Sequence, residues 1–486
     1  MAPTRKRSST LAAVVLAAGK GKRMRSPRPK VLQAVCGRPS LWHVLRSARG
    51  ARPDAIVVVV HEGGEQVEQA VRSWGIKPEP VFVDQGDPLG TGQAVLMAEE
   101  AVAGVDDVLA MAGDQPLVSE DQVRSLVRTH RRTRAGATIM TTWLEDPKGY
   151  GRVIRDGDRL SHIAEEADAT ADVKKIREVA VLVYAFHRED LFKALPLVGR
   201  ENRQHEFYLQ DVFPILQDKG EHVSVVAVDL SGSVGINSRK ELADAERIMR
   251  GRIVEAHMAN GVTFVDPSSS YLDVDVRIGA DTVILPTTFL EGSTKIGARC
   301  SIGPSTRVVD STVGDDAEVS FSVVRQSKIG RGATVGPYAN LRPGTVLEQK
   351  AKAGSFVEIK ASRIGRGAKV PHLSYVGDAK VGAGANIGAA TVTVNYDGFE
   401  KHRTEIGEDA HIGSDTMLVA PVKVGKGAFT GAGSVITRDV PAGSLAVERS
   451  EQRVVPGYAA RKRAKHEAKS RRRSTGTNDA RGEGKP

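Results

Sequence analysis

The spacing of hydrophobic residues changes once along the chain, near residue 240. Before that point, short apolar runs alternate with stretches in which apolar residues recur every three or four positions, as in an amphipathic helix. We predict helices over 65–74 and 120–130 and buried strands at Ala55–Val60, Val81–Val83, Asp107–Asp114 and Ala137–Thr142. This alternation indicates a Rossmann-like α/β domain with a mostly parallel sheet, and such sheets bind ligands at the carboxyl ends of their strands.

Beyond residue 260, aliphatic residues recur at intervals of six, often followed by Gly. A strand keeps such residues on one face because six is a multiple of two, whereas a helix of 3.6 residues per turn would scatter them. The pattern predicts a parallel β-helix of hexapeptide repeats, with three short strands in each coil of about 18 residues. The predicted inward positions are Ile278, Ile284, Leu290, Ile296, Ile302, Val308, Val313, Val319, Ile329, Val335, Leu341, Leu347, Ile364, Val370, Val376, Val381, Ile387, Ile406, Ile412, Leu418, Val424, Thr430 and Ile436.

These patterns divide the chain into five parts. Residues 11–239 form the α/β domain and residues 261–460 form the β-helix domain. Between them, residues 240–260 have helical periodicity with acidic residues early, and Asn260-Gly261 ends this linker helix. Residues 1–10 and 461–486 are polar, basic tails that we expect to be disordered. Within the β-helix, the polar segment NYDGFEKHRT interrupts the count after Ile387, and we expect it to protrude as a loop.

The net charge of +10 is concentrated in the two tails. Residues 1–10 carry three basic residues, and residues 461–486 carry ten Lys or Arg against three Asp or Glu, so +3 and +7 account for the whole +10. The rest of the chain is balanced, and no specific nucleic-acid partner is expected. A solubilising role of the tails and a weak contact with RNA or an acidic surface both fit this composition.

The cysteine content and the first apolar run bear on the compartment. Two cysteines, Cys36 and Cys300, are too few for a disulfide framework or a Cys-based zinc site, which fits a reducing compartment. The segment RKRSSTLAAVVLAAG mimics a signal peptide, but its apolar run is short and basic residues follow at once. We expect it to be the first strand of a cytoplasmic protein. We expect no membrane span, because no apolar run approaches the about 20 residues that cross a bilayer.

The segment after this first strand is suited to binding an anion. It reads VVLAAGKGKRMRSPRPKVL from Val14 to Leu32. Gly19 and Gly21 allow backbone N–H groups to approach phosphate oxygens, and Arg23 and Lys30 supply positive charge. The segment lacks the GK[ST] of a P-loop and the third glycine of a dinucleotide fingerprint, so the motif alone does not name its ligand.

Further segments make the interpretation specific. They are PLGTGQA and AGDQPL in the first half, and LRPGT, FVEIK, PHLSYVGDA, NIGAATVTVNYDG and GSDTMLVAPV in the second. In this order they resemble the bifunctional N-acetylglucosamine-1-phosphate uridyltransferase/glucosamine-1-phosphate acetyltransferase family over residues 11–450. The resemblance implies a nucleotidyltransferase α/β domain, a left-handed β-helix, and a homotrimer whose acetyltransferase sites lie between subunits.

In the first half, the resemblance implies uridylyl transfer from UTP to N-acetylglucosamine 1-phosphate, with release of pyrophosphate. The attacking phosphate is already ionised, so the protein has to position the reactants and neutralise charge. Arg23 is implied as a catalytic residue, and Asp114 and Asn237 as ligands of Mg²⁺, a hard cation that prefers oxygen donors. The residues implied to bind UTP or the UDP-sugar are Leu16, Ala17, Ala18, Gly19, Lys30, Gln85, Gly90, Thr91, Gly151 and Glu165.

In the second half, the resemblance implies acetyl transfer from acetyl-CoA to the amine of glucosamine 1-phosphate. An ammonium group cannot attack a thioester until a base removes a proton, and His372 is implied as that base, oriented by Glu358. Arg342, Lys360, Tyr375, Asn386 and Lys401 are implied to bind glucosamine 1-phosphate. The residues implied at the acetyl-CoA site are Ala389, Asn395, Tyr396, Ser414, Ala432 and Arg449.

The sugar pocket of the first half departs from the family pattern. Ala180 stands where the family has Asn and Leu182 where it has Gly, and His205 and Gln210 replace a usual Gly and Thr. One alternative is therefore an active acetyltransferase whose uridyltransferase is impaired or altered in sugar specificity. Another is a guanylyl- or thymidylyltransferase with a regulatory β-helix. A third is a non-enzymatic trimeric scaffold, against which the retained Arg342, Lys360, His372 and Tyr375 argue.

Overall fold

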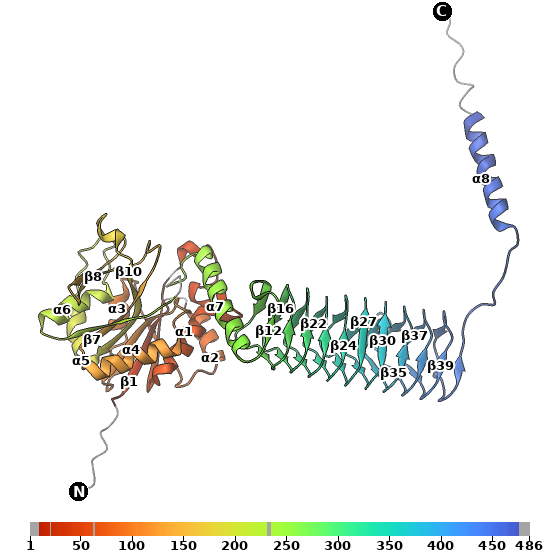
Figure 1. Cartoon of the computed structure of the whole chain (residues 1–486), viewed down its shortest axis with the longest axis horizontal. Coiled ribbons are helices and arrows are strands. Elements are labelled where there is room, and N and C mark those ends of the chain that lie inside the picture. Colours follow the sequence, from red (N-terminus) through yellow and green to blue (C-terminus); the bar gives the residue numbers. More distant parts are fainter. Residues whose placement is uncertain (1–8, 20, 62–63, 231–234, 476–486) are drawn as a thin grey trace, which may run out of the picture.

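The computed structural model describes residues 9–19, 21–61, 64–230 and 235–475. An α/β domain occupies the N-terminal half, and an elongated three-sided prism occupies the C-terminal half (Figure 1). The long helix α7 (Arg239–Ala259) lies between them, where the sequence predicts a linker helix. The change of hydrophobic spacing near residue 240 therefore marks the change of architecture.

The α/β domain is built on one twisted sheet with the strand order β11-β7-β10-β6-β1-β4-β5. β10 runs antiparallel to both neighbours, and the other pairs along this path are parallel. The predicted strands are confirmed as β4, β5, β6 and β7, with small differences at their ends. The strands of this domain are β1 (Leu11–Leu16), β4 (Ala55–Val60), β5 (Val81–Asp84), β6 (Asp107–Ala112), β7 (Ala137–Trp143), β8 (Arg152–Asp156), β9 (Arg159–Ala164), β10 (Glu178–His187) and β11 (Val223–Ala227).

Helices pack on both faces of this sheet, which explains why its strands are almost continuously apolar. Residues of β1 alternate between two hydrophobic cores: Ala13 and Val15 face one, and Ala12 and Val14 face the other. The first core contains buried residues of α1, α2 and α4, and the second contains those of α3, α5 and α6. The helices are α1 (Ser40–Ala48), α2 (Glu65–Ser73), α3 (Thr91–Leu96), α4 (Glu120–Thr133), α5 (Arg188–Ala194) and α6 (Val212–Asp218).

The second half is a parallel β-helix whose strands form three sheets along the prism, all with parallel pairing. The first sheet contains β12 (Thr263–Phe264), β15 (Val283–Ile284), β18 (Ser301–Ile302), β21 (Glu318–Val319), β24 (Thr334–Val335), β27 (Lys352–Ser355), β30 (Lys369–His372), β33 (Asn386–Ile387), β36 (His411–Ile412), β39 (Phe429–Thr430) and β41 (Leu445–Ala446). The second contains β13 (Ser270–Leu272), β16 (Thr288–Glu291), β19 (Arg307–Val309), β22 (Val323–Arg325), β25 (Asn340–Leu341), β28 (Glu358–Lys360), β31 (Tyr375–Gly377), β34 (Val392–Val394), β37 (Met417–Val419) and β40 (Val435–Ile436). The third contains β14 (Arg277–Ile278), β17 (Lys295–Ile296), β20 (Thr312–Val313), β23 (Lys328–Ile329), β26 (Val346–Leu347), β29 (Arg363–Ile364), β32 (Ala379–Val381), β35 (Thr404–Ile406) and β38 (Val422–Val424).

The predicted inward residues form the core of the prism. All of them are buried except Ile278, which is partly buried and packs against that core. Where the predicted series of inward residues skips a position, the structure buries Val324, Ala353, Ile359 and Thr393, each with an exposed fraction of at most 1%. As predicted, the segment after Thr393 leaves the prism, and its residues 396–401 are exposed between β34 and β35.

One edge of the prism carries an apolar ridge, which we define as Phe321, Tyr338, Phe356 and Leu373. These residues occupy successive turns between the first and second sheets, all with positive φ. Tyr338 stacks on Phe356 with ring centroids 5.1 Å apart. The exposed fractions of the four residues are 39%, 56%, 59% and 62%. Contiguous exposed apolar surface of this kind marks an interaction site.

The hairpin of β2 (Ala34–Val35) and β3 (Arg38–Pro39) ties the α/β domain to the prism. The backbone N–H of Cys36 donates to Glu246 on α7 at 2.6 Å, and its carbonyl accepts from Val274 at 3.0 Å. Arg38 pairs with Asp275 at 2.5 Å. Burial beside Glu246 raises the pKa of the Cys36 thiol well above its usual range. These contacts join three parts of the chain in one junction.

The two terminal segments differ from our expectation. Residues 461–475 are not disordered but belong to a helix, α8 (Tyr458–Thr475), because Ala, Arg, Lys and Glu in this segment are strong helix formers. At the other end, Thr10 donates its backbone N–H to Asp106 at 2.7 Å, and Ser9 donates to Asp107 at 2.8 Å. Residues 1–8 and 476–486 lie outside the described part of the chain. Among the residues described, no helix has the length and apolar character needed to cross a membrane.

Candidate active sites

A cavity of about 360 Å³ opens at the carboxyl ends of β1 and β6. Predicted ligand-binding residues line it: Leu16, Ala18, Gly19, Lys30, Gln85, Gly90, Thr91, Asp114, Gly151, Glu165 and Asn237. They come from segments more than 200 residues apart, so the fold itself assembles the cavity. This is the edge of the sheet at which ligands were predicted to bind.

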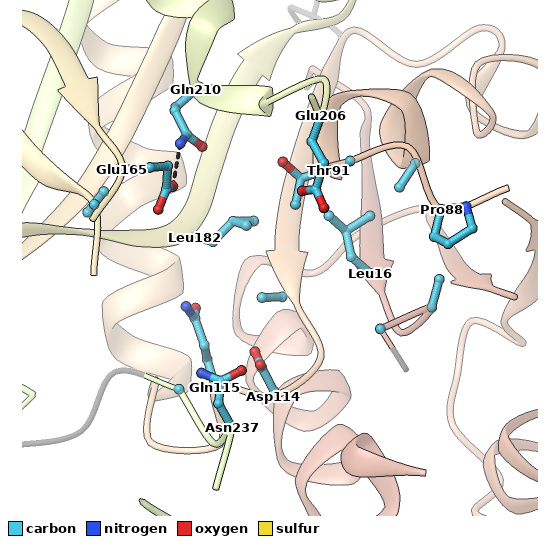
Figure 2. Close-up of a pocket in the computed structure, with 18 of the residues that line it drawn as sticks. Leu16, Pro88, Thr91, Asp114, Gln115, Glu165, Leu182, Glu206, Gln210 and Asn237 are labelled. Carbon is cyan, nitrogen blue, oxygen red and sulfur yellow. Dashed lines mark hydrogen bonds between the residues drawn. The ribbon is translucent and has the colours of Figure 1, made fainter. Parts of the chain in front are cut away.

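One end of the cavity holds a lysine between two oxygen donors. Lys30 Nζ lies 2.5 Å from Asp114 Oδ2 and 3.1 Å from Asn237 Oδ1. Figure 2 shows Asp114 and Asn237 next to each other on the floor of the pocket. The backbone N–H of Asn237 donates to Glu241 at 2.6 Å, which anchors the segment before α7. The predicted proximity of Asp114 and Asn237 is confirmed.

These two oxygens fit a divalent cation. Both contact one positively charged atom, so they already converge on a single cation position. A Cβ placed on Gly235 would lie 3.7 Å from Asp114 Oδ1, in van der Waals contact, so this glycine leaves space beside the carboxylate. No group of three or more acidic, His or Cys side chains that could hold a metal occurs in the described residues. The remaining ligands of a cation here would therefore be substrate oxygens and water, as Mg²⁺ tolerates.

A second part of the cavity is a hydrogen-bonded loop around Gln85. Its side-chain amide donates to the Gly90 carbonyl at 3.1 Å and to Gln93 Oε1 at 2.7 Å. Gly90 has a φ of 125°, and a Cβ there would lie 2.4 Å from the Phe207 carbonyl oxygen, so only glycine fits. The Thr91 hydroxyl accepts from the Leu209 N–H at 3.0 Å. This network fixes the start of α3 beside the cavity.

The third part is the predicted sugar pocket. Gln210 Nε2 donates to Glu165 Oε1 at 2.5 Å (Figure 2). Burial raises the pKa of Glu165, and the nearby carboxylates act in the same direction. Ala180 and Leu182 also line the cavity, and in the view of Figure 2 Leu182 lies between the Glu165–Gln210 pair and Asn237. Three of the four departures from the family pattern are therefore part of the pocket.

Some predicted residues lie outside the cavity. Arg23 is exposed on the short 3-10 turn Lys22–Met24, and Ala17 is buried with its N–H bonded to the Val59 carbonyl at 2.8 Å. The fourth departure, His205, is exposed with a φ of 54°. The cavity also contains residues that we did not predict, namely Val31, Pro88, Ala94, Ala112, Gln115, Gly149, Tyr150, Tyr184, Glu206 and Gly235. Pro88 and Gln115 belong to the motifs PLGTGQA and AGDQPL, so those motifs contained the missing signal.

In the second half, predicted residues gather on the second sheet of the prism. Glu358 and Tyr375 are neighbours in register on β28 and β31. Arg342 donates to Glu358 Oε1 at 2.9 Å, and Asn340 donates to Glu358 Oε2 at 3.3 Å. Within the described residues no hydrogen bond joins Glu358 to His372, and the orientation of His372 by Glu358 stays a prediction.

A basic cluster lies at the far edge of this sheet, where the chain turns to the third sheet. Lys360 Nζ lies 4.0 Å from Asp378, whose Oδ2 also accepts from Asn395 at 2.5 Å. The pKa of Lys401 is lowered, chiefly by the neighbouring ammonium of Lys360. Two neighbouring ammonium groups repel each other, and a nearby negative charge relieves this repulsion. The predicted Lys360, Lys401 and Asn395 therefore lie together around Asp378.

His372 lies at the opposite edge, as the last residue of β30 beside Leu373 of the apolar ridge. Its side chain is exposed on the outside of the prism. The backbone of Ala389 follows one coil later, and Ser414 and Ala432 follow in the next coils, with the Ala389 carbonyl bonded to the Asp415 N–H at 2.7 Å. Arg449 donates to the Ala432 carbonyl at 3.1 Å. His372, Ala389, Ser414, Ala432 and Arg449 thus form a row along one edge, whereas Asn395 lies at the opposite edge.

Two other predicted residues of this half are placed differently. Asn386 lies on the first sheet and pairs in register with Lys369 and His411. Tyr396 is on the protruding loop, where its hydroxyl donates to the Gly398 carbonyl at 2.6 Å. Neither contacts the Lys360 cluster through a hydrogen bond within the described part of the chain.

Comparison with known proteins finds a family match in each half of the chain. Residues 13–209 match the MobA-like NTP transferase domain, and residues 403–438 match the bacterial transferase hexapeptide family of six repeats. The chain is 44% identical to the bifunctional protein GlmU of Desulfitobacterium hafniense over 453 residues, 93% of this chain and 99% of the relative. It is 47% identical to that of Heliobacterium modesticaldum, covering 93% and 98%. For the GlmU of Streptomyces avermitilis the identity is 46%, covering 93% and 94%.

Proposed function

The chain belongs to the family of bifunctional GlmU proteins, and we propose how its residues divide the two reactions. The left-handed β-helix half transfers the acetyl group of acetyl-CoA to glucosamine 1-phosphate. The α/β half then transfers the uridylyl group of UTP to N-acetylglucosamine 1-phosphate and releases pyrophosphate. The observation that carries this assignment is the convergence of Lys30, Asp114 and Asn237 in a cavity whose other walls are the predicted nucleotide and sugar residues.

In the α/β half, Asp114 and Asn237 would hold Mg²⁺, which supplies charge to the phosphate oxygens when it is bound. Lys30 now occupies the position between these oxygens, so its ammonium has to turn away when the nucleotide enters. It then neutralises the triphosphate, together with the backbone at Gly19. Gln85, Gly90 and Thr91 hold the uracil side, and Gly151 and Glu165 hold the sugar. Arg23 stays a prediction as a contact of the triphosphate.

The chemistry of this half needs no protein base. An ionised oxygen of the sugar phosphate attacks the α-phosphorus of UTP, and the bond to the bridging oxygen of pyrophosphate breaks. Negative charge moves from the attacking oxygen to pyrophosphate, so a cation next to the departing phosphates stabilises the transition state. Lys30 is the side chain placed to supply that charge.

In the β-helix half, the basic cluster of Lys360 and Lys401 would bind the phosphate of glucosamine 1-phosphate, with Arg342, Tyr375 and Asn386 at the rest of the sugar. His372 accepts a proton from the substrate ammonium, and the free amine attacks the thioester carbonyl. The attacking nitrogen gives up a second proton as the C–S bond breaks; the sulfur of CoA takes up one proton, and the other is released to solvent. Backbone groups of Ala389, Ser414 and Ala432, together with Arg449, would hold acetyl-CoA along the edge that carries His372, and Asn395 and Tyr396 stay predictions as acetyl-CoA contacts.

We propose that the acetyltransferase works as a homotrimer. His372 and Lys360 lie at opposite edges of the second sheet, and the five residue-to-residue steps from Leu373 to Asp378 separate these edges by about 16 Å. A sugar phosphate is too short to reach both, so a second copy has to complete the site. The apolar ridge next to His372 is the surface such a copy would cover, and Phe399, 92% exposed at the tip of the protruding loop, would reach toward it. Because UTP and acetyl-CoA are the proposed substrates, we propose that the enzyme works in the cytoplasm.

Two assays on one preparation test the proposal. CoA thiol release is measured with glucosamine 1-phosphate, and pyrophosphate release with UTP and N-acetylglucosamine 1-phosphate. Lys30→Ala should lower only the second rate, by about 100- to 1000-fold, and His372→Ala should lower only the first, by about 100- to 10,000-fold. Arg28→Ala and Lys369→Ala, exposed neighbours of each, are the controls. The division of labour fails if either variant lowers both rates, and a preference for GTP or dTTP over UTP would favour another nucleotidyltransferase.

A further inference from the structure

The C-terminal helix α8 is strongly basic, and no other segment of the described chain covers its residues 458–471. Over residues 458–471, its side chains are exposed throughout, and the charged ones are a single Glu467 and the basic residues Arg461, Lys462, Arg463, Lys465, Lys469 and Arg471. Figure 1 shows α8 well away from the prism, connected to it by an extended segment. Six basic groups against one carboxylate on such a short helix create a strong local positive potential.

The basic residues point to every side of α8. Successive residues of a helix are rotated by about 100°, so Arg461, Arg463 and Arg471 point about 0°, 200° and 280° around the axis. Lys462, Lys465 and Lys469 fill the sector between about 40° and 100°. The apolar residues over 458–471 are Tyr458 and four alanines, so the helix has no wide apolar face.

This distribution separates the kinds of polyanion that could bind. A helix that lies on a bilayer needs an apolar face that inserts among the lipids, and it carries its charged residues on the opposite face only. A helix in the groove of a nucleic-acid duplex has phosphates on both flanks. The major groove of B-form DNA is about 12 Å wide, which matches the 10–12 Å diameter of a helix with its side chains. The 18 residues of α8 extend for about 27 Å, the length of about eight base pairs.

We propose that α8 is a docking site for the phosphodiester backbone of a nucleic-acid duplex, independent of base sequence. The site lies outside the enzymatic machinery, whose last predicted residue is Arg449, and residues 450–457 connect it to the prism without regular strand or helix. The GlmU proteins of Desulfitobacterium hafniense and Heliobacterium modesticaldum match over 99% and 98% of their own length but over 93% of this chain, so part of this chain has no counterpart in those two relatives. Binding here would carry the enzyme to a duplex without changing either reaction.

The test uses the full-length protein and fluorescence anisotropy with a 20-base-pair DNA duplex and an RNA hairpin of similar length. If four of the six cations contact phosphates, the logarithm of the affinity should fall with a slope of about −3.6 against the logarithm of the salt concentration. That slope predicts a loss of about 100-fold between 50 and 200 mM salt. The DNA duplex should bind more tightly, because the major groove of A-form RNA is too narrow for a helix.

Two variants locate the site. A chain that ends at residue 457 should lose binding to both probes, and the triple variant Arg461→Gln, Lys465→Gln and Lys469→Gln should weaken it at least tenfold while keeping the helix, because Gln is a good helix former. The matched control is Lys295→Gln, Lys328→Gln and Lys380→Gln, which removes three exposed lysines from the prism. The proposal is overturned if the shortened chain binds as tightly as the full chain. It is also overturned if vesicles of phosphatidylserine and phosphatidylcholine bind the protein more tightly than either duplex.

Discussion

Replacing Leu182 by glycine should raise the efficiency of the uridyltransferase with N-acetylglucosamine 1-phosphate. The half-buried Leu182 side chain lines the cavity next to Ala180 and the Glu165–Gln210 pair, where the family pattern has glycine beside the N-acetyl group. A side chain crowded against a bound group typically costs about 1–3 kcal/mol, which corresponds to about 5- to 150-fold in kcat/KM. Ala180→Asn would return a hydrogen bond worth about 1 kcal/mol, or about fivefold.

The assay compares kcat/KM for N-acetylglucosamine 1-phosphate and glucose 1-phosphate by pyrophosphate release. Wild type, Leu182→Ala, Leu182→Gly, Ala180→Asn and the double variant form a graded series, and each is melted to check folding. The gain should be confined to the N-acetyl sugar, because glucose 1-phosphate carries only a hydroxyl at the same carbon. If the wild type prefers the N-acetyl sugar and Leu182→Gly leaves the ratio of the two efficiencies unchanged, Leu182 does not obstruct the pocket and the reasoning is refuted.

Three further predictions concern stability and assembly. Burial, together with the carboxylates of Glu165 and Asp168, raises the pKa of Asp211 to about 6. Protonation of Asp211 therefore stabilises the fold fully at pH values below the usual Asp pKa near 3.8, and this stabilisation is lost as the pH rises through 6. The pKa shift corresponds to about 3 kcal/mol of folding free energy, which partial exposure of Asp211 reduces to about 1–2 kcal/mol. In calorimetry, Asp211→Asn should therefore melt a few degrees above wild type at pH 7.5 and at the same temperature as wild type at pH 4. A difference in melting temperature that is the same at both pH values would contradict this prediction. Tyr338→Asp with Phe356→Asp puts two carboxylates into the apolar ridge. This double variant should dissociate the proposed trimer in light scattering and abolish acetyl transfer but not uridylyl transfer; a trimer that persists would mean that the interface lies elsewhere. Gly37 has a φ of 79°, and a Cβ there would lie 2.3–2.7 Å from the carboxyl group of Asp273, so Gly37→Ala should lower the melting temperature and expose the junction to proteolysis. The control is Gly75→Ala, because Gly75 also has a positive φ but has open space around it. If both variants lower the melting temperature equally, backbone strain alone explains the loss of stability.

The sequence predicted the regular parts of the fold because their hydrophobic spacing is itself the packing pattern. Val14 and its neighbours are apolar on both faces because helices cover both faces of the sheet, and the interval of six places Ile302 or Leu418 inside the prism. Inward positions such as Ala353 and Thr393 were not predicted, because small or polar residues also fit inside the prism where a coil changes length. The helix α8 was not predicted, because a highly charged composition is typical of disordered segments, although the same residues also favour a helix.

The candidate sites were predicted residue by residue from motifs, and the structure shows what motifs do not contain. Nothing in the sequence says that Lys30 occupies the position between Asp114 and Asn237, or that Gln210 bonds Glu165, because both contacts join segments that only the fold brings together. The motif also does not distinguish Arg23, which points to solvent, from Lys30, which points inward.

The bond between Lys30 and Asp114 has a practical consequence for handling the enzyme. Because an internal ammonium compensates the carboxylate, the floor of the pocket keeps its charge balance when no divalent ion is present. Protein purified in a chelator should therefore remain intact, and uridylyl transfer should resume without a lag once the chelator is saturated with magnesium.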